Sequence, residues 1–592
     1  MRLLLAPLLA LLPSSASASD AYWTTKWDGP CSSSCNTDGG SGVSASGTRP
    51  VAVQCVQETG LGANDLYKLT DAECEASSKP SPFVACSLTC VYISPDGSDS
   101  NPGSSAAPLQ TLGACITQFG VDVTNKFPDD VSTETQLACL MKGGVYKQET
   151  GAPLAGVDHL LVRPASEEDV VVIDGTDALE GLVWSESAAT EGVMTAPLPS
   201  GTLRPDLIVG GYAIQCAAED AIADPPHDDK VGWATASPPC FLWDPFEGWV
   251  ANGGPFSKDD AEAYFEEGSM EWGAEARLPW MWIDAGEGVL HVDVERAPGG
   301  ILPVSVVKKN AERADLFLIQ EESHRIFVED LNFYGAGCCG AGPESPVSTK
   351  KSTDLRLYNN RFLYAPPTGV RLIGTANTGR GMAGYVKIHG NTFEFGEAVV
   401  TYKGTGSYVT DNYAVFNSFE ARGEYSFVGL AMRSCFSMNT LLYNGDKGGH
   451  YNWAAGNHIA ENLVIGSNFL GPSFDAAVFH SLGTAGEGLL IEHNWVLGPS
   501  LVSFARLDTA IVTQKEDANR YVTIQHNVHF GLGIVLKGYN HTVEHNTGSK
   551  MLIVADWGDY IDDHNRQTIS RYNAHTLVQS RGSTLENDAV PG

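Results

Sequence analysis

A short pattern recurs along the second half of the chain: an apolar strand, an asparagine, and then another apolar pair. Tyr358-Asn-Asn360-Arg-Phe and Glu492-His-Asn494-Trp-Val are two examples. The asparagines at this position are Asn360, Asn391, Asn412, Asn462, Asn494, Asn527 and Asn546. Most neighbours are 19 to 33 residues apart, which suits a solenoid whose coils keep their strands and vary their loops. We expect these amides to stack at one turn of successive coils, each bonding the next; scattered loop asparagines are the alternative.

Composition and charge exclude several classes of protein. The chain has 592 residues, of which 43% are hydrophobic and 18% charged, so it is neither a disordered tail nor a coiled coil. Its formal charge of −34 repels nucleic acid and anionic membranes, and we expect neither as a partner. The 63 glycines and 31 prolines indicate many turns and few long helices.

The first residues predict an export signal. An apolar run from Leu3 to Leu12 is too short to span a bilayer, and Ala16-Ser17-Ala18 has the small residues of a cleavage site. Residues 1–18 are therefore predicted to be a signal peptide, and the product is expected to be secreted and extracellular. Such a compartment also favours disulfides among the 13 cysteines, whose odd number leaves at least one thiol unpaired.

Residues 22–90 carry six of these cysteines in a characteristic order. The order is Trp23, Trp27, Cys31, Cys35, Arg49, Cys55, Cys74, Cys86 and Cys90. This segment resembles a thrombospondin type 1 repeat, a small module held by disulfides and by tryptophan rings layered with arginine. The resemblance implies the pairs Cys31–Cys86, Cys35–Cys90 and Cys55–Cys74. It also implies a non-catalytic module that binds glycans or an extracellular protein partner.

Residues 91–175 have a second characteristic order: YISPDGSDSNPG, then LQTL, GGVY and VVVIDG. It resembles the opening of secreted right-handed parallel β-helix proteins of the pectin-lyase-like group. The resemblance implies a mainly β fold, with a β-helix domain over 91–592. Residues Leu109 to Phe119 predict a short amphipathic helix suited to capping that domain. Asp96 and Asp99 suit a turn, with a calcium site as the alternative; no other cofactor is expected.

Residues 203–300 interrupt the strand pattern and are rich in tryptophan and acids. Cys216 and Cys240 lie where they would close a loop inside this segment. We expect a β-rich insertion that walls one side of a groove.

Basic residues near the ends of several apolar strands are the first candidate site. They are Arg371, Lys403, Arg433, His480, Arg506 and Lys537. Placing Val428, Leu430 and Met432 inward by alternation turns Arg433 outward, and the same parity serves Lys403, His480 and Lys537. Coils in register would then align a basic stripe on an acidic protein, suited to an anionic polysaccharide. Solvent-facing strand ends are the alternative.

The loop from Asn444 to Trp453 is the second candidate site. It brings together Lys447, His450 and Trp453, where a base, an imidazole and an aromatic face would suit proton transfer and sugar binding. An ordinary polar loop is the alternative.

Two reactions fit these residues on a carbohydrate-active β-helix. In β-elimination, cations neutralise a uronate carboxylate and a base removes the neighbouring proton, with Lys447, His450, His480, Arg506 and Lys537 as candidates and Arg371, Lys403, Arg433 and Trp453 binding substrate. In glycoside hydrolysis, two of Asp446, Asp475 and Asp508 would flank the bond. The basic stripe favours a lyase; an epimerase and a non-catalytic matrix or polysaccharide-binding protein are further alternatives.

Overall fold

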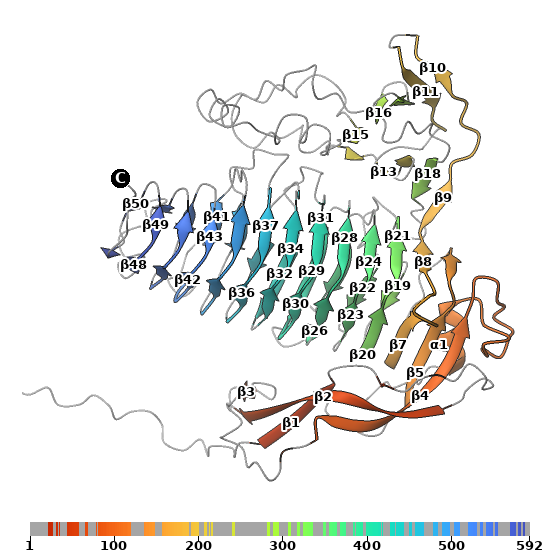
Figure 1. The fold of residues 1–592 in the computed structure, drawn as a ribbon, viewed down its shortest axis with the longest axis horizontal. Coiled ribbons are helices and arrows are strands. Elements are labelled where there is room, and N and C mark those ends of the chain that lie inside the picture. The colour runs from red at the N-terminus through yellow and green to blue at the C-terminus, as the bar shows by residue number, and fades with distance from the viewer. Residues whose placement is uncertain are drawn as a thin grey trace, which may run out of the picture.

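The computed structural model is built on three parallel sheets wound into one solenoid (Figure 1). It describes the strands and helix given below with their short turns, within residues 22–58, 66–68, 79–119, 135–147, 157–199, 207–216, 240–242, 281–294, 306–309 and 317–586, with gaps in several ranges. Each complete coil gives one strand to sheet 1, then one to sheet 2, then one to sheet 3. The predicted parallel β-helix fold is confirmed.

Sheet 1 contains β4 (Phe83–Ile93), β5 (Thr135–Met141), β7 (Asp158–Pro164), β20 (His324–Glu329), β23 (Arg356–Tyr358), β27 (Lys387–His389), β30 (Tyr408–Thr410), β33 (Cys435–Ser437), β36 (His458–Ala460), β39 (Leu490–Glu492), β42 (Thr523–Gln525), β45 (Thr542–Glu544), β48 (Ile569–Arg571) and β51 (Thr584–Glu586). Sheet 2 contains β6 (Gly144–Tyr146), β8 (Val171–Asp174), β21 (Asn332–Tyr334), β24 (Arg361–Leu363), β28 (Thr392–Glu394), β31 (Tyr413–Val415), β34 (Thr440–Leu442), β37 (Leu463–Ile465), β40 (Trp495–Leu497), β43 (Val528–His529), β46 (Thr547–Gly548) and β49 (Ala574–His575).

Sheet 3 contains β19 (Phe317–Ile319), β22 (Val347–Lys350), β25 (Thr368–Ile373), β29 (Ala398–Thr405), β32 (Phe427–Met432), β35 (Gly449–Asn452), β38 (Ala477–Leu482), β41 (Ser503–Asp508) and β44 (Ile534–Leu536), with β26 (Ala383–Gly384) beside β29. A further parallel pair, β47 (Met551–Val554) and β50 (Val578–Arg581), follows β44 in the next coils. The strands of all three sheets are short and the loops that join them differ in length, as the irregular asparagine spacing indicates.

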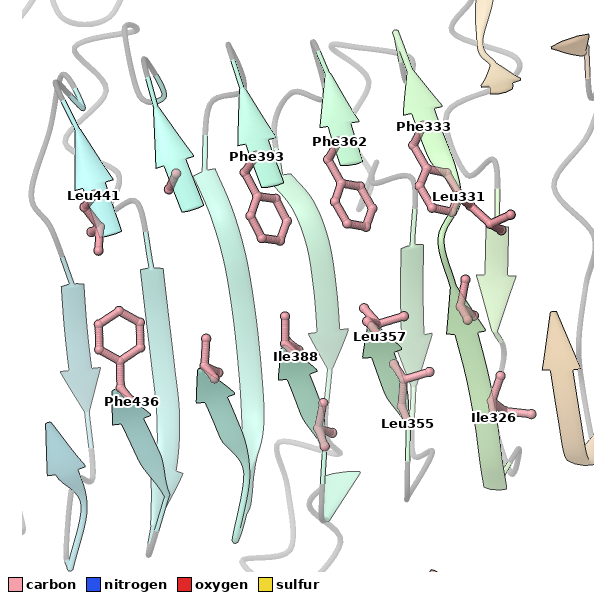
Figure 2. Close-up of a cluster of buried hydrophobic side chains, with 14 of the residues drawn as sticks. Ile326, Leu331, Phe333, Leu355, Leu357, Phe362, Ile388, Phe393, Phe436 and Leu441 are labelled. Carbon is pink, nitrogen blue, oxygen red and sulfur yellow. The ribbon is translucent and has the colours of Figure 1, made fainter. Parts of the chain in front are cut away.

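The core lies inside the coils and is made of side chains that repeat from one coil to the next. Phe333, Phe362 and Phe393 occupy the same position of β21, β24 and β28, and their rings stack with centroids 4.9 and 4.8 Å apart (Figure 2). Leu357 and Ile388 of sheet 1 face them and are fully buried. Because each coil covers the apolar face of its neighbour, no coil buries its core alone.

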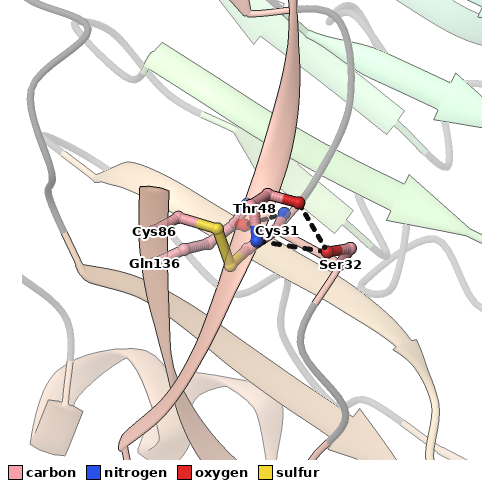
Figure 3. Close-up of a disulfide and its surroundings, with 5 residues drawn as sticks. All are labelled: Cys31, Ser32, Thr48, Cys86 and Gln136. Atoms are coloured by element: carbon pink, nitrogen blue, oxygen red, sulfur yellow. Dashed lines mark hydrogen bonds between the residues drawn. A yellow bond between two sulfur atoms is a disulfide. The ribbon is translucent and has the colours of Figure 1, made fainter. Parts of the chain in front are cut away.

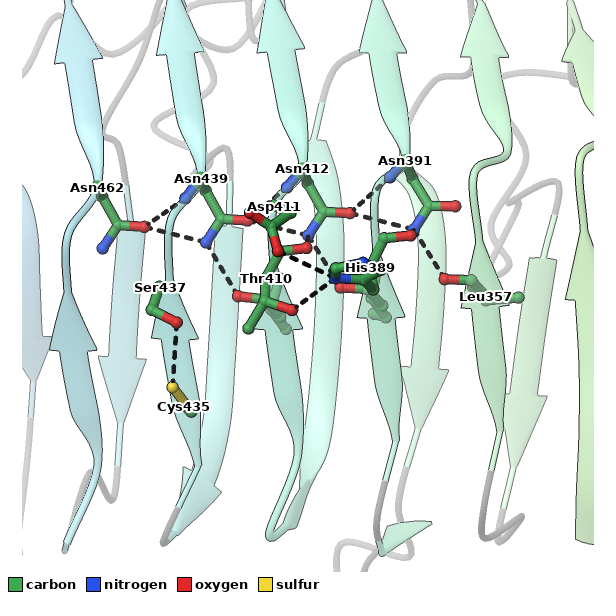
Figure 4. Close-up of polar contacts among 12 residues, drawn as sticks. Leu357, His389, Asn391, Thr410, Asp411, Asn412, Cys435, Ser437, Asn439 and Asn462 are labelled. Atoms are coloured by element: carbon green, nitrogen blue, oxygen red, sulfur yellow. Dashed lines mark hydrogen bonds and ion pairs between the residues drawn. The ribbon is translucent and has the colours of Figure 1, made fainter. Parts of the chain in front are cut away.

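An asparagine ladder holds the turn between sheets 1 and 2 (Figure 4). The side-chain oxygen of Asn412 accepts hydrogen bonds from the backbone and side-chain amides of Asn391, and the Asn412 amide donates to Asn439 in the next coil. All seven predicted asparagines belong to this ladder, together with Asn439 and Asn573. The residue before most rungs has a left-handed backbone, for example Asp411 with φ 55°. The turn therefore repeats the same geometry coil after coil.

The N-terminal module joins the solenoid through a shared strand. It contains β1 (Tyr22–Trp27), β2 (Ser44–Glu58) and β3 (Leu66–Lys68), and β2 pairs antiparallel with the first half of β4. The second half of β4 pairs in parallel with β5 as the first strand of sheet 1, so β4 runs through the predicted boundary at residue 90. Module and solenoid thus share one continuous strand.

Disulfides fix the module against the outer face of sheet 1. The structure contains Cys31–Cys86 and Cys35–Cys90, the pairs expected from the resemblance, whereas the side chains of Cys55 and Cys74 lie outside the described residues. The Cys31 backbone donates to Gln136 of β5 over 2.9 Å (Figure 3). Buried Cys31, Cys86 and Cys90 also pack with Leu161 and Phe327 of the first coils.

Helix α1 (Leu112–Phe119) covers the start of the solenoid, close to the predicted Leu109–Phe119. Leu112 and Ile116 are buried, and Cys115 is tied to Cys139 of β5 by a disulfide. Both carboxylate oxygens of Asp99 accept hydrogen bonds from Gln110 and Thr111 at the start of this helix. Asp99 therefore serves the turn. Within the described residues no helix is long and apolar enough to cross a membrane.

Antiparallel strands occupy the region between the first coils and β19 (Figure 1). One sheet contains β10 (Ser185–Glu186), β11 (Val193–Pro197), β14 (Gln215–Cys216), β15 (Cys240–Leu242), β16 (Met281–Asp284) and β17 (Val289–Asp293), and another contains β9 (Thr176–Ala178), β12 (Leu207–Val209), β13 (Tyr212–Ala213) and β18 (Val306–Lys309). Cys216 lies directly opposite Cys240 in the β14–β15 register. The antiparallel pairing begins at Thr176, earlier than the predicted insertion start near 203.

Candidate functional site

Sheet 3 aligns four of the predicted site residues in one row. Parallel pairing from strand to strand gives the row Ser348, Arg371, Thr401, Val428, His450, His480, Arg506 and Val535. His450, His480 and Arg506 lie on three consecutive strands, and adjacent strands of a sheet are about 4.8 Å apart. His450, expected in a loop, lies in strand β35, and pairing of the strands places it beside His480, 30 positions further along the chain.

The neighbouring row shows which face this is. Val347, Val370, Val400, Phe427, Gly449, Phe479, Ala505 and Ile534 align with one another. Phe479, Ala505 and Ile534 belong to the core inside the coils. Val478 and Phe504, near the start of β38 and β41, also belong to this core, so both faces are buried there. Further along, Leu507 and Leu536 are buried whereas Val535 is half-buried, and since side chains alternate along a strand, the row of Arg506 and Val535 belongs to the outer face of sheet 3.

The predicted alternation in β32 is wrong by one residue. Val428 was placed inward, but it aligns with His480, while Phe427 aligns with Phe479 of the core. Leu430 likewise aligns with Lys403, which is two positions along from Thr401 in β29. The prediction failed because every residue from Phe427 to Met432 is apolar or glycine, so composition could not show which positions face inward; the pairing with neighbouring strands does.

His480 and Arg506 are buried although they lie in the outer row. Their exposed fractions are 3% and 8%. A guanidinium removed from water is costly unless it makes hydrogen bonds or ion pairs, and both residues do have polar or ring contacts. In such an enclosed place a cation acts more strongly on a bound anion than it would in water. This pair is therefore the best-defined part of the candidate site.

The remaining candidates are less fully placed. For Arg371, Lys403, His450 and Asp508 the structure describes the backbone only. Outside the described residues lie Arg433, Lys447, Trp453 and Lys537, and also Asp446 and Asp475 of the hydrolytic alternative. In the part of the chain that is described, no group of three or more His, Cys, Asp or Glu side chains is arranged to hold a metal ion.

A polar cluster on sheet 1 escaped the sequence analysis. One oxygen of Glu492 lies 2.9 Å from His458 Nε2, and the other accepts a hydrogen bond from Gln525 and lies 3.7 Å from His493 Nδ1. Burial opposes ionisation of Glu492, but the bonds from Gln525 and His458 outweigh it and lower the pKa of this carboxyl. Glu492 and Gln525 end the successive strands β39 and β42, whereas His458 begins β36 and His493 follows β39. Only the register of the coils brings these four residues together, so the sequence alone did not reveal the cluster.

Comparisons with known proteins support the fold. No protein-family model and no curated protein matches the chain. Among solved structures it is similar to one described as XylC in complex with xylose, with a TM-score of 0.51 and 11% identity over 84% of this chain and 86% of that one. A glycoside hydrolase (TM-score 0.37, 12% identity, 84% and 96% covered) and a rhamnogalacturonan lyase (0.30, 10%, 85% and 86%) also match. At 11% identity the first of these structures supports a shared fold alone, and the other two are too dissimilar to add to that.

Proposed function

We propose that this protein is a secreted, carbohydrate-active β-helix protein that cleaves a uronate-containing polysaccharide by β-elimination on the outer face of sheet 3. The observation that carries the proposal is the row in which His450, His480 and Arg506 are consecutive, with the last two buried. The similar solved structures include proteins named as a glycoside hydrolase and a lyase, which agrees with a carbohydrate substrate. The three disulfides of the described residues agree with an extracellular protein.

The proposed roles follow from charge and geometry. Arg506 pairs with the uronate carboxylate, since a guanidinium matches a carboxylate with two parallel hydrogen bonds. Neutralising that carboxylate makes the neighbouring C–H more acidic, because the carbanion that forms is stabilised. His480, one strand away, accepts this proton as general base.

The electron pair of the broken C–H bond then forms a carbon–carbon double bond. The glycosidic C–O bond breaks, and its oxygen takes a proton from an acid, for which His450 and Lys447 are the candidates. The products are one unsaturated end and one new hydroxyl end. Arg371, Lys403 and Trp453 extend the binding surface for further sugar units, while Lys537 continues the basic stripe beyond Arg506. Arg433 is left out of this surface, because its outward placement rested on the alternation that the register of β32 contradicts.

The test uses purified protein with polyuronates and neutral polysaccharides, with and without calcium. The expected result is new ultraviolet absorbance from unsaturated ends, abolished in His480→Gln and strongly reduced in Arg506→Lys. His389→Gln, an exposed histidine on sheet 1, is the matched control and should retain full activity. Reducing ends without absorbance would instead indicate hydrolysis, with Asp508 as the first residue to substitute. Binding without either product would indicate a matrix or polysaccharide-binding protein.

A further inference from the structure

A stack of exposed rings runs along the corner between sheets 1 and 2. His493, His526, His545 and Tyr572 each precede a rung of the asparagine ladder in successive coils, and we call them the ring ladder. Their centroids are 5.2, 4.9 and 5.1 Å apart and their planes differ by 13°, 4° and 11°. All four side chains are exposed. Because the ring faces cover one another, the ladder presents ring edges with their nitrogen and hydroxyl groups to solvent.

The ring ladder is rigid before any ligand arrives. Each ring is carried by a left-handed backbone position, with φ 54°, 55°, 56° and 57°. The next residue in each case is a buried asparagine bonded to its neighbours, as for Asn494, Asn527 and Asn546. A row of donors fixed at regular spacing loses little freedom when a repeating polymer binds along it.

The charged groups around the ring ladder determine whether it attracts an anionic or a cationic ligand. Glu461 precedes it in the same row, Glu492 and Glu544 lie on its sheet 1 side, and Arg571 is bonded to Glu544. Sheet 2 contributes the uncharged Trp495, Val528 and Thr547 on the other side. With neutral imidazoles, the three carboxylates and one guanidinium among the described side chains leave a net charge of −2; the backbone of Glu586 aligns with Arg571 in the next coil.

Histidine is the side chain that changes charge between about pH 5 and 8. Protonation of His493, His526, His545 and nearby His458 would add four charges and turn the net −2 into +2. The Glu492 carboxylate lies between two of these rings, 2.9 Å from His458 Nε2 and 3.7 Å from His493 Nδ1. Stacked imidazolium groups repel one another at this spacing, and anions laid along the row relieve that repulsion.

We propose that the ring ladder is an acid-switched docking track for an acidic polysaccharide, which it binds with the polymer parallel to the solenoid axis when its histidines are protonated. A uronate chain carries one carboxylate on each sugar unit, and the ring ladder carries one imidazolium edge on each of three coils. The polymer and the ladder are therefore opposite in charge, and both repeat at regular intervals. The track is separate from the sheet 3 site and does not depend on cleavage by it.

The test measures equilibrium binding of fluorescent polygalacturonate to the full chain at constant ionic strength, at about pH 5.5 and about pH 7.5. A His480→Gln background keeps the polymer intact if sheet 3 cleaves it. Binding should be about tenfold tighter at the lower pH, the size expected from a few exposed charge contacts. The neutral polymer dextran should show no such difference.

Variants of the ring ladder make the result specific. The pair His526→Gln and His545→Gln leaves only His493 and His458 to change charge and should lose most of the pH effect, whereas His389→Gln, an exposed histidine elsewhere on sheet 1, should keep it. The pair His526→Lys and His545→Lys should bind at both pH values, a gain that a misfolded protein would not show. Binding that is equal at the two pH values, or a pH effect that is undiminished in the glutamine pair, would overturn the proposal, whether or not the protein cleaves the polymer.

Discussion

Replacing Asn412 by alanine should remove one rung of the asparagine ladder and strongly destabilise the middle coils. The Asn412 side chain is 1% exposed. Its amide donates to the carbonyls of Ile388 and Thr410 and to Asn439, and its oxygen accepts from the backbone and side chain of Asn391. Alanine leaves the backbone N–H of Asn391 and the carbonyl oxygen of Ile388 without these partners, in a place that excludes water.

A buried polar group that loses its partner costs about 1–3 kcal/mol, so the two main losses together predict about 3–5 kcal/mol of unfolding free energy. Asn412→Asp should not rescue stability, because a carboxylate cannot donate to the Asn439 oxygen, 2.9 Å from the present amide. Thr440→Ala, on the outward side of β34, is the control and should change stability by less than about 0.5 kcal/mol.

Denaturant unfolding gives the free energy, and hydrogen exchange locates the effect. The Asn391 amide proton should lose protection while amides near β4 keep theirs, because coils in a solenoid interact mainly with their neighbours. A loss below about 1 kcal/mol with unchanged protection at Asn391 would refute the view that the ladder stabilises the turn.

Three further predictions concern other parts of the molecule. Gly548→Ala should destabilise by about 1–3 kcal/mol in thermal unfolding, since a Cβ there would lie 2.4 Å from the ring of buried His529; an unchanged midpoint would show that this ring moves freely. Burial, opposed by Arg163 and aided by Asp330, raises the pKa of Glu329 to about 7. The folded state therefore holds this proton more tightly, stability falls as pH rises from about 4.5 to 7, and Glu329→Gln should remove up to about 3 kcal/mol of that dependence in denaturant titrations at several pH values. Replacing both Cys31 and Cys86 by serine should cost about 2–4 kcal/mol, and a matched loss of protection in β5 would show that the disulfide also supports the solenoid.

Much of the fold was predictable because it rests on repetition. The asparagine rungs recur beside similar residues in the sequence. Each buried amide must hydrogen-bond the equivalent asparagine of the next coil, and few other side chains could do the same. Asn439 was missed because the apolar Met438 stands directly before it, where the other predicted rungs follow a polar residue or a glycine.

The candidate site was predictable in part. Arg371, Lys403, His480 and Arg506 lie within strands of sheet 3, two or more residues before the strand ends. The row shared by His450, His480 and Arg506 depends on loop lengths that shift each strand, which the sequence alone does not reveal. The ring ladder was missed altogether, because its members are 33, 19 and 27 residues apart and only the coil register makes them neighbours.

The shared strand β4 has a consequence for how the chain acquires its structure. A parallel coil has no partner until a neighbouring edge exists, so the first coil of any solenoid is the hardest to form. Here the first half of β4 is ordered by antiparallel pairing with β2 and by two disulfides, and its second half then offers a ready edge to β5. As the chain is synthesised from its N-terminus, the disulfide-bonded N-terminal module would act as a template on which coils fold one at a time. Folding of the solenoid would then proceed in one direction along its axis.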